Sequence, residues 1–281
     1  MLIFFMKPSD SLPLSGMLNL SKVMKNGVCY LILILIIGAC KEKNVAKFAK
    51  SEPISVVKEE IFIYPIEHAT AVLEWNDITV YIDPVGGSNA FKGKKQPDLI
   101  LITDIHGDHF SLETLEELNT DKAKIIVPQA VADKIPEQFT PQLDVLNNGD
   151  SKERFGITVE AIPMYNLREE ALKFHSKGRG NGYVLNMGDK RIYFSGDTED
   201  IPEMRALKNI DRAFVCMNLP YTMTEESAAD AVLEFKPKQV FPYHYRGRPK
   251  VSDVAKFKSL VNKGSSEIEV IQLDWYPKAD Y

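Results

Sequence analysis

The sequence DLILITDIHGDH (residues 98–109) joins an apolar run to a dense group of imidazoles and carboxylates. The apolar part predicts a buried β-strand. In extended backbone alternate residues share one face, so Asp104, His106 and Asp108 would point to the same side. The glycine before Asp108 permits a tight turn that would bring His109 beside them. Two imidazoles and two carboxylates are costly to bury together without a cation, so the segment predicts a metal site; an ordinary polar loop is the alternative.

Two further candidate ligands follow apolar runs much later in the chain. Asp197 lies in YFSGDTED (residues 193–200), and His244 lies in VFPYHYRG (residues 240–247). Taken singly, the aspartate would be interpreted as a turn residue and the histidine as a surface residue. Side chains that converge from several strand ends form a rigid site. We therefore expect both residues to join the cluster at 104–109.

The chain around these residues is rich in short β-type runs. They are IFIYPI (61–66), AVLEW (71–75), ITVYI (78–82), DLILIT (98–103), KIIVP (124–128), ITVEAIP (157–163), GYVLNM (182–187) and RIYFSG (191–196). Hairpin turns are predicted at Asn76-Asp77 and at Gly188-Asp189.

Helical patterns are fewer than strand patterns. They cover residues 111–118 with Ser111 as the N-cap, residues 224–235 with a capping box from Thr222 to Glu225, and a stretch that begins at Ser252. Many strands with few helices predict an α+β fold in which sheets pack together and helices cover them.

The N-terminal region resembles an export leader. Residues 28–37 form an apolar run that is shorter than the roughly 20 residues of a bilayer span. Lysines precede this run and Gly38-Ala39-Cys40 follows it, an order that resembles the lipobox of bacterial lipoproteins. We predict that residues 1–39 are a signal segment, with Met24 as an alternative start, and that Cys40 is lipidated. A short buried strand is the alternative interpretation.

Residues 40–60 are then a lipidated cysteine and a charged tether, and residues 61–281 are the globular domain. The predicted location is the bacterial cell envelope, on its periplasmic or surface face, with the membrane as a partner through Cys40. Cys216 lies in an apolar run and is predicted to be an inert buried thiol.

The composition excludes several classes of protein. With 281 residues, of which 44% are hydrophobic, the chain has the apolar surface that a disordered chain lacks. A net charge of −5 argues against a nucleic-acid partner, because such proteins usually carry a basic field.

Together these motifs resemble the signature of metallo-β-lactamase-fold metallo-hydrolases, which is His-x-His-x-Asp-His, then a histidine, a bridging aspartate and a final histidine. The resemblance covers residues 67–245. Further stretches are similar to the branch that contains L-ascorbate-6-phosphate lactonase: HATAVLEW (68–75), YIDPV (81–85), PMYN (163–166), FHSKGRGNGY (174–183), YFSGDTEDIPEM (193–204) and YTMT (221–224).

This resemblance implies a four-layer αββα sandwich with metal ions at the edges of its two sheets, so that residues 61–281 are a metallo-hydrolase domain. One implied metal site contains Asp108, His109, Asp197 and His244. The other contains Asp104, His106 and Asn166, with Asp197 bridging the two.

Two residues depart from the family pattern. Asp104 stands in place of the first histidine of the signature, and Asn166 in place of the third. A neutral amide is a poorer ligand than an imidazole, so the second site is expected to be weaker. His175 is left as a substrate contact, a metal ligand or a plain loop residue.

Charge counting bears on the choice of metal. Two divalent ions would be neutralised by Asp104, Asp108, Asp197 and one hydroxide. The all-histidine pattern would leave one more positive charge. One or two divalent ions are expected, with zinc first and the harder Mn²⁺ or Fe²⁺ as alternatives.

The expected reaction is hydrolysis. A bound divalent ion lowers the pKa of water from about 16 toward 7, so a metal-bound hydroxide could attack a carbonyl or phosphoryl centre. Asp108 is the predicted catalytic residue, orienting the nucleophile and moving a proton. Ser195 lies outside a Gly-x-Ser-x-Gly elbow, which argues against a serine hydrolase.

The expected substrate is a small anionic ester, lactone or phosphodiester. The predicted substrate contacts are basic and aromatic residues, although a solvated basic loop is the alternative for the charged ones: Tyr165, His175, Lys177, Tyr221 and Arg246. His68 resembles a histidine common near the entrance in this family, and a core or supporting role is equally open.

Two rival functions remain. The first is a lipid-directed phosphodiesterase similar to N-acylphosphatidylethanolamine phospholipase D, because a lipid anchor would place the enzyme beside such a substrate. The second is a non-catalytic metal-binding lipoprotein, which the departures at Asp104 and Asn166 would suit.

Overall fold

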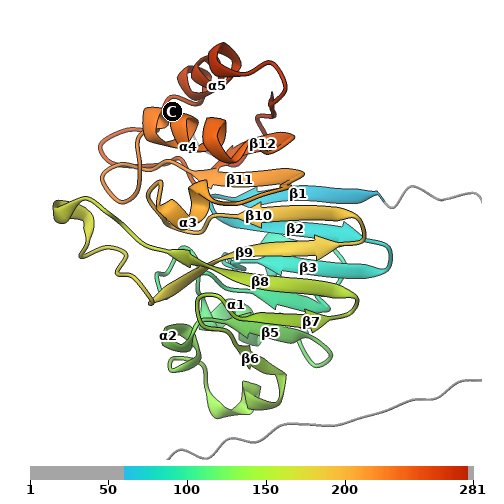
Figure 1. The fold of residues 1–281 in the computed structure, drawn as a ribbon. Coiled ribbons are helices and arrows are strands. Elements are labelled where there is room, and N and C mark those ends of the chain that lie inside the picture. The colour runs from blue at the N-terminus through green and yellow to red at the C-terminus, as the bar shows by residue number, and fades with distance from the viewer. Residues whose placement is uncertain (1–59, 278–281) are drawn as a thin grey trace, which may run out of the picture. The chain divides into compact units, whose positions relative to one another are not determined.

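The computed structural model describes residues 60–277 of the chain. The predicted signal segment, Cys40 and nearly all of the predicted tether lie outside these residues. Within them, the strands form two mixed sheets that pack face to face (Figure 1). No helix in this part of the chain combines the length and the apolar character that crossing a membrane requires.

The first sheet has six strands in chain order. Strands β1 to β3 are antiparallel, and β3 to β6 are parallel. The strands are β1 (Ile61–Glu67), β2 (Thr70–Trp75), β3 (Ile78–Ile82), β4 (Leu99–Leu101), β5 (Lys124–Val127) and β6 (Leu143–Val145).

The second sheet has seven strands, also in chain order. Strands β7 to β10 are antiparallel, and β10 to β13 are parallel. The strands are β7 (Ser151–Arg154), β8 (Ile157–Met164), β9 (Gly180–Met187), β10 (Lys190–Phe194), β11 (Arg212–Cys216), β12 (Gln239–Tyr243) and β13 (Glu269–Val270).

Five α-helices and three 3₁₀ helices accompany these strands in residues 60–277. They are η1 (Ser88–Phe91), α1 (Leu112–Glu117), α2 (Gln129–Ala132), η2 (Glu137–Gln142), η3 (Glu169–Ala171), α3 (Pro202–Arg205), α4 (Glu225–Phe235) and α5 (Val254–Gly264).

The alternation of apolar side chains along the strands explains the layers. In β3, Val80 and Ile82 point into the core between the sheets, while Tyr81 points to the outer face. That outer face is covered by α1, α2, η1 and η2 through residues such as Leu115 and Val131. On the other side, α4 and α5 pack on the second sheet, where Phe235 contacts the ring of Tyr193. The predicted αββα sandwich is therefore confirmed.

The predicted runs and hairpin turns coincide with strands and turns of the structure. Two predicted helix starts were wrong by one or two residues. Thr224, not Thr222, caps α4, because the hydroxyl of Thr222 is hydrogen-bonded within the loop to Asn218. Asp253, not Ser252, caps α5, and the hydroxyl of Ser252 donates to the carbonyl oxygen of Met217. Ser111 caps α1 as predicted.

The parallel strands bring chemically important segments to one edge. In the first sheet, β3 leads to Asp83 and β4 leads to the segment 104–109. In the second sheet, β10 leads to Asp197 and β12 leads to His244. The segment between β8 and β9 projects from the body at the left of Figure 1. Ligands of open sheets commonly bind at such carboxyl ends of strands.

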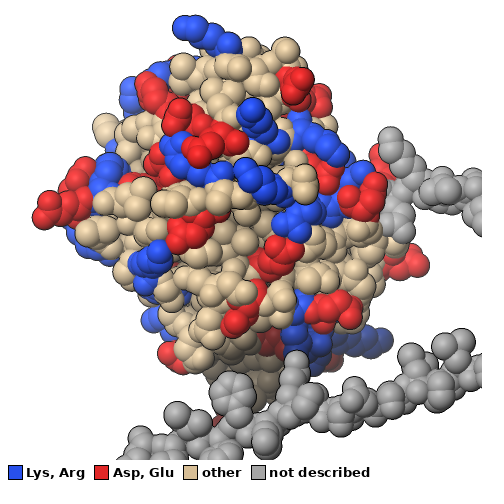
Figure 2. Space-filling view, in the orientation of Figure 1, with Lys and Arg blue, Asp and Glu red and all other residues tan. Residues whose placement is uncertain are grey.

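Charged side chains of both signs are interspersed on the face shown in Figure 2. Among the described residues, Arg191 lies 2.8 Å from Glu160 (Nη1 to Oε1), and Arg205 lies 2.7 Å from Glu234 (Nη1 to Oε2). Exposed pairs of this kind contribute little to stability.

Candidate metal centre

All five histidines of the sequence lie in one place. His106 and His109 come from the segment after β4, His175 from the projecting segment, His244 from the end of β12 and His68 from the turn between β1 and β2. Together with three aspartates they form groups within each of which the ligand-type atoms lie within 4.8 Å of one another, and two of these groups share His244.

The most deeply buried of these groups contains His109, Asp197 and His244. The two Nε2 atoms of the histidines are 3.0 Å apart. Asp197 contacts both rings, with Oδ2 3.4 Å from His109 Nε2 and Oδ1 3.3 Å from His244 Nε2. Asp108 lies beside them, with Oδ2 3.4 Å from His244 Nε2. This is the set that the sequence predicts for one metal site.

The second group contains Asp104, His106 and His175. Asp104 Oδ2 lies 2.8 Å from His106 Nδ1 and 4.0 Å from His175 Nε2. His175 Nε2 also lies 3.1 Å from Asp197 Oδ2. Asp197 therefore lies between the two groups, where the sequence predicts a bridging carboxylate.

Asn166 contacts His175 instead of the other predicted ligands. Its Nδ2 donates to the carbonyl oxygens of Tyr221 (2.7 Å) and Ala171 (2.9 Å) and lies 3.2 Å from His175 Nδ1. Nδ1 of His175 is 3.1 Å from the same Tyr221 carbonyl, to which it can only donate. In the neutral ring this leaves Nε2 as the atom with a free lone pair, directed at Asp197.

Asp104 has a partner that the sequence motifs do not predict. Arg179 binds both carboxylate oxygens, with Nε 3.0 Å from Oδ1 and Nη2 2.8 Å from Oδ2. Asp104 itself is fully buried. Arg179 therefore offsets the negative charge that an aspartate adds in place of a neutral histidine, and the charge count from Asp104, Asp108 and Asp197 does not include it.

Asp83 is the functional residue that the motif analysis missed. This buried carboxylate accepts from the backbone N–H of Thr103 (Oδ1, 2.7 Å), and its Oδ2 lies 2.8 Å from His109 Nδ1. It fixes the ring so that Nε2 faces the other ligands, as carboxylates behind metal-binding histidines do. The signal for it was an aspartate after the strand ITVYI, because Asp104 follows the next parallel strand in the same way.

Replacing Asp83 by asparagine is expected to lower zinc affinity about 10- to 100-fold, because an amide orients and polarises the His109 ring less well than a carboxylate. Competition with a chromophoric chelator measures the affinity. Asp98, whose Oδ2 accepts from the backbone N–H of Thr79 in the same sheet, provides the matched control. Equal affinities for Asp83→Asn and Asp98→Asn would contradict the assigned role.

Backbone conformation helps to aim these residues. His68 (φ 57°), Asp83 (φ 44°) and His244 (φ 46°) adopt left-handed conformations that are uncommon for residues other than glycine. Such conformations cluster at functional sites. Gly196, which precedes Asp197, also has a positive φ of 60°, and a Cβ there would lie 2.4 Å from Met164 Sδ.

The charges in the site are strongly coupled. Burial alone would raise the pKa of Asp197, but the rings of His244, His109 and His175 around it lower this pKa well below its ordinary value. Burial would lower the pKa of His109, yet Asp197 and Asp83 on its two sides raise it well above the usual value. Burial and the neighbouring His244 lower the pKa of His68 to about 4.

The site opens into a cavity of about 310 Å³. Of the predicted substrate contacts, His175, Tyr221 and Arg246 line it, together with His68, His106, Asp108, Phe174, Asp197 and Asn218. Tyr165 and Lys177 are not among the lining residues, because both are paired with Glu203: Tyr165 Oη donates to Oε2 (2.9 Å) and Lys177 Nζ to Oε1 (2.8 Å). Cys216 is buried, and burial raises its thiol pKa to about 12, as expected for an inert thiol.

The donor set fits divalent metal ions. His175 Nε2 and Asp197 Oδ1 are buried and make no hydrogen bond within the described residues, although both face the site. Buried polar atoms normally have a hydrogen-bond partner or a metal partner, so these two atoms need a further partner. Imidazole nitrogens and carboxylate oxygens in this arrangement are the ligands of zinc and of related transition metals.

Comparison with known families agrees with this geometry. The family model described as "Beta-lactamase superfamily domain" matches residues 63–244. The chain belongs to this superfamily. Among its relatives is a UPF0173 metal-dependent hydrolase of Thermococcus onnurineus, which is 30% identical over 191 residues, covering 65% of this chain and 84% of the relative. The chain is thus a member of the UPF0173 metal-dependent hydrolases, and the predicted enzyme class is confirmed.

Solved structures of the superfamily have the same fold. A protein of Parabacteroides distasonis described as a metal-dependent hydrolase is 34% identical, with a TM-score of 0.68 over 76% of this chain and 93% of that chain. A metallo hydrolase of Ignicoccus hospitalis, at 22% identity and a TM-score of 0.63, covers 76% of this chain and 94% of its own; that likeness concerns the fold alone.

Proposed function

We propose that this metal-dependent hydrolase cleaves a small anionic ester, lactone or phosphodiester. The observation that carries the proposal is the convergence of five histidines and three aspartates on one site, five of which line its cavity: His68, His106, His175, Asp108 and Asp197. The similarity of the sequence to the L-ascorbate-6-phosphate lactonase branch supports a lactone among these substrates. The cation Arg246, which lines the cavity, supports an anionic group on the substrate.

The residues that would hold the metal ions fall into two sets. His109, His244, Asp108 and Asp197 would form the first, and Asp104, His106, His175 and Asp197 the second. We place His175 in the second set, where the sequence pattern had Asn166, because His175 Nε2 faces Asp197 while the amide of Asn166 is occupied by backbone carbonyls. Divalent ions at these positions, zinc first and manganese or iron as alternatives, would supply activated water and polarise the scissile bond.

The side chains that line the cavity have separate tasks. Asp108, whose side chain is 45% exposed, is the carboxylate able to orient a water molecule and move its proton. Arg246 provides the cation that could pair with a carboxylate or phosphate of the substrate. Tyr221 and Phe174 provide the aromatic part of the wall.

The cavity volume favours a small substrate. About 310 Å³ is at the lower end of the range for small-molecule sites, roughly 300–1,000 Å³. A phospholipid with two acyl chains would need more room than a cavity of this volume provides. The size therefore supports the small-ester proposal over the lipid-directed one.

Replacing Asp108 by alanine is expected to reduce hydrolysis to the uncatalysed background. The test compares wild type, Asp108→Ala and the exposed control Asp121→Ala on a panel of lactones, thioesters and bis-p-nitrophenyl phosphate. Turnover by wild type and by the control, without turnover by Asp108→Ala, supports the proposal. The same background rate in all three proteins would favour a non-catalytic metal-binding protein.

We also propose that the enzyme is lipid-anchored in the bacterial cell envelope through Cys40. The proposal rests on the lysines, the apolar run and the lipobox-like Gly38-Ala39-Cys40. In a bacterial host, metabolic labelling with palmitate is expected to mark the wild-type protein but not Cys40→Ser. Wild-type protein without label would contradict the anchor.

A further inference from the structure

His68 is held tightly in the turn between β1 and β2, although it belongs to neither predicted ligand set. Its side chain is buried, and its backbone has the left-handed φ of 57°. The backbone N–H donates to the carbonyl oxygen of Trp275 (3.1 Å), and its carbonyl oxygen accepts from the N–H of His244 (3.3 Å). The turn is thereby fixed to the C-terminal segment and to the strand end that carries a metal-binding candidate.

The hydroxyl of Tyr276 determines which nitrogen of His68 carries the proton. Its oxygen accepts hydrogen bonds from the backbone N–H groups of Tyr245 and Arg246, both at 3.1 Å. It also lies 2.6 Å from His68 Nδ1. A hydroxyl has two lone pairs and one hydrogen, so the third bond must be donated by Tyr276 to Nδ1. His68 Nδ1 is therefore an acceptor, and the ring proton resides on Nε2.

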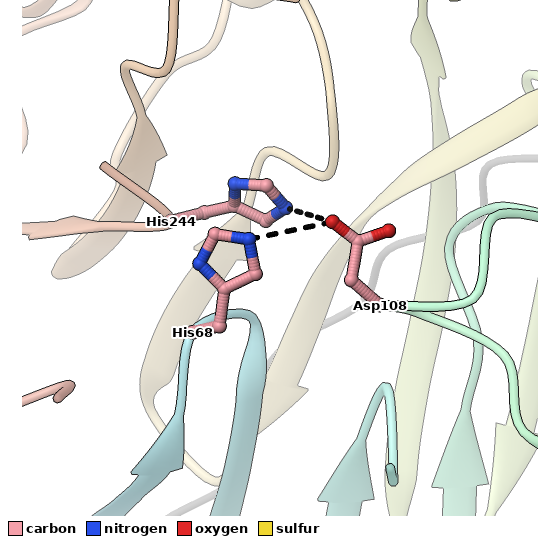
Figure 3. A group of neighbouring side chains, drawn as sticks. All are labelled: His68, Asp108 and His244. Atoms are coloured by element: carbon pink, nitrogen blue, oxygen red, sulfur yellow. Dashed lines mark ion pairs between the residues drawn. The ribbon is translucent and has the colours of Figure 1, made fainter. Parts of the chain in front are cut away.

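That Nε2–H group faces Asp108. His68 Nε2 lies 3.3 Å from Asp108 Oδ2, and Figure 3 shows the rings of His68 and His244 directed at the same carboxylate oxygen. Among residues 60–277, the other ion-pair partners of Asp108 are His244 and His109, at 3.4 Å and 3.9 Å. Both would be engaged by metal, so His68 is the partner that remains available to hold the carboxylate.

We propose that His68 is a positioning residue of the enzyme: Tyr276 keeps its ring in the Nε2–H form, and this N–H holds Asp108 Oδ2. The proposal rests on the proposed function, because Asp108 is the residue being positioned. It also excludes His68 as a metal ligand, although His68, Asp108 and His244 lie close enough to form a ligand set. A protonated Nε2 cannot donate a lone pair to an ion.

The tautomer can be measured without any substrate. In the full-length protein labelled with ¹⁵N-histidine and loaded with zinc, long-range ¹H–¹⁵N spectra distinguish protonated from unprotonated ring nitrogens, and loss of a signal in His68→Gln assigns it. We expect a protonated Nε2 and an unprotonated Nδ1. A proton on Nδ1, protons on both nitrogens, or a zinc-bound Nε2 would each overturn the proposal.

Two amide variants separate positioning from packing. In His68→Gln the amide nitrogen replaces Nε2 and can still donate to Asp108, whereas in His68→Asn it replaces Nδ1 and faces Tyr276. We expect kcat of His68→Asn to fall about 10- to 100-fold with KM little changed, and His68→Gln to recover most of that loss. Equal loss in both variants, or a ranking that follows thermal stability alone, would overturn the proposal.

The hydroxyl of Tyr276 has a matched control. Tyr193 has a buried hydroxyl without a hydrogen-bond partner in the described residues, so Tyr193→Phe removes the same group without touching the site. Cobalt(II) titration followed by absorption is expected to show weaker binding for Tyr276→Phe and His68→Asn than for Tyr193→Phe and His68→Gln. If no substrate is turned over, the proposed function fails. The tautomer measurement and the cobalt titration still test whether His68 holds Asp108.

Discussion

Replacing Asp197 by asparagine is expected to remove most of the bound metal and to lower hydrolysis by more than about a hundredfold. Changes to groups behind metal ligands already cost about 10- to 100-fold, so the loss of a direct ligand should cost more. Asp197 is also the one carboxylate, among the residues described, that contacts histidines of both groups: His109 and His244 on one side, and His175 on the other.

The measurement combines metal analysis with rates on the best substrate of the panel. Asp200 lies three residues further along the chain and pairs with Arg205 away from the ligands, so Asp200→Asn is the matched control and should behave as wild type. Asp197→Asn protein that keeps both its metal and its activity would show that the two groups do not share this carboxylate.

Metal affinity is expected to fall as the pH is lowered from 8 to 6.5. The fall is about tenfold per pH unit for every proton that the metal displaces. In the metal-free protein, His109 lies between Asp83 and Asp197, and these carboxylates raise its pKa well above 6.5. The two carboxylates thus favour the protonated ring in the metal-free protein, and an ion that binds Nε2 must displace that proton. A flat affinity profile, measured by chelator competition, would contradict this charge state.

Unfolding does not account for this loss. A histidine whose folded pKa is raised contributes stability that is fully present below its unfolded pKa and is lost as pH rises through the folded value. His109 thus makes the metal-free protein no less stable at pH 6.5 than at pH 8. Thermal unfolding of the metal-free protein at both pH values provides the control. The folded-state pKa of His68 is lowered to about 4. Its cost to folding stability therefore appears only below the pKa of the unfolded chain, near 6.5, and grows as the pH falls toward 4.

The sequence predicts much of the fold because its strands repeat a simple pattern. ITVYI and DLILIT are short runs rich in apolar residues, and each contains a strand of the first sheet. Helix starts are harder, because neighbouring hydroxyls compete for the same role. Thr222 and Thr224 both precede α4, and the hydrogen bonds of the Thr222 hydroxyl with Asn218 in the same loop leave Thr224 as the cap.

The predicted ligand cluster also assembles, apart from Asn166, because its members follow strands whose ends meet at one edge. Their supporting partners could not be predicted from spacing. Arg179 pairs with Asp104 from 75 residues away, and Tyr276 pairs with His68 from 208 residues away. Such contacts depend on how the two sheets and the C-terminal segment pack, which no local motif records. His175 was left open for the same reason, since its orientation is fixed by the Tyr221 carbonyl.

The central claim is that four histidines and three aspartates gather around divalent cations: His106, His109, His175, His244, Asp104, Asp108 and Asp197. Metal content of protein purified without chelators, measured by inductively coupled plasma mass spectrometry, tests it most directly. One to two equivalents of zinc, manganese or iron per chain are expected, with most of this metal lost in Asp197→Asn. Less than about 0.3 equivalents of any transition metal in the wild-type protein would contradict the account, since a cluster of this kind at neutral pH requires cations.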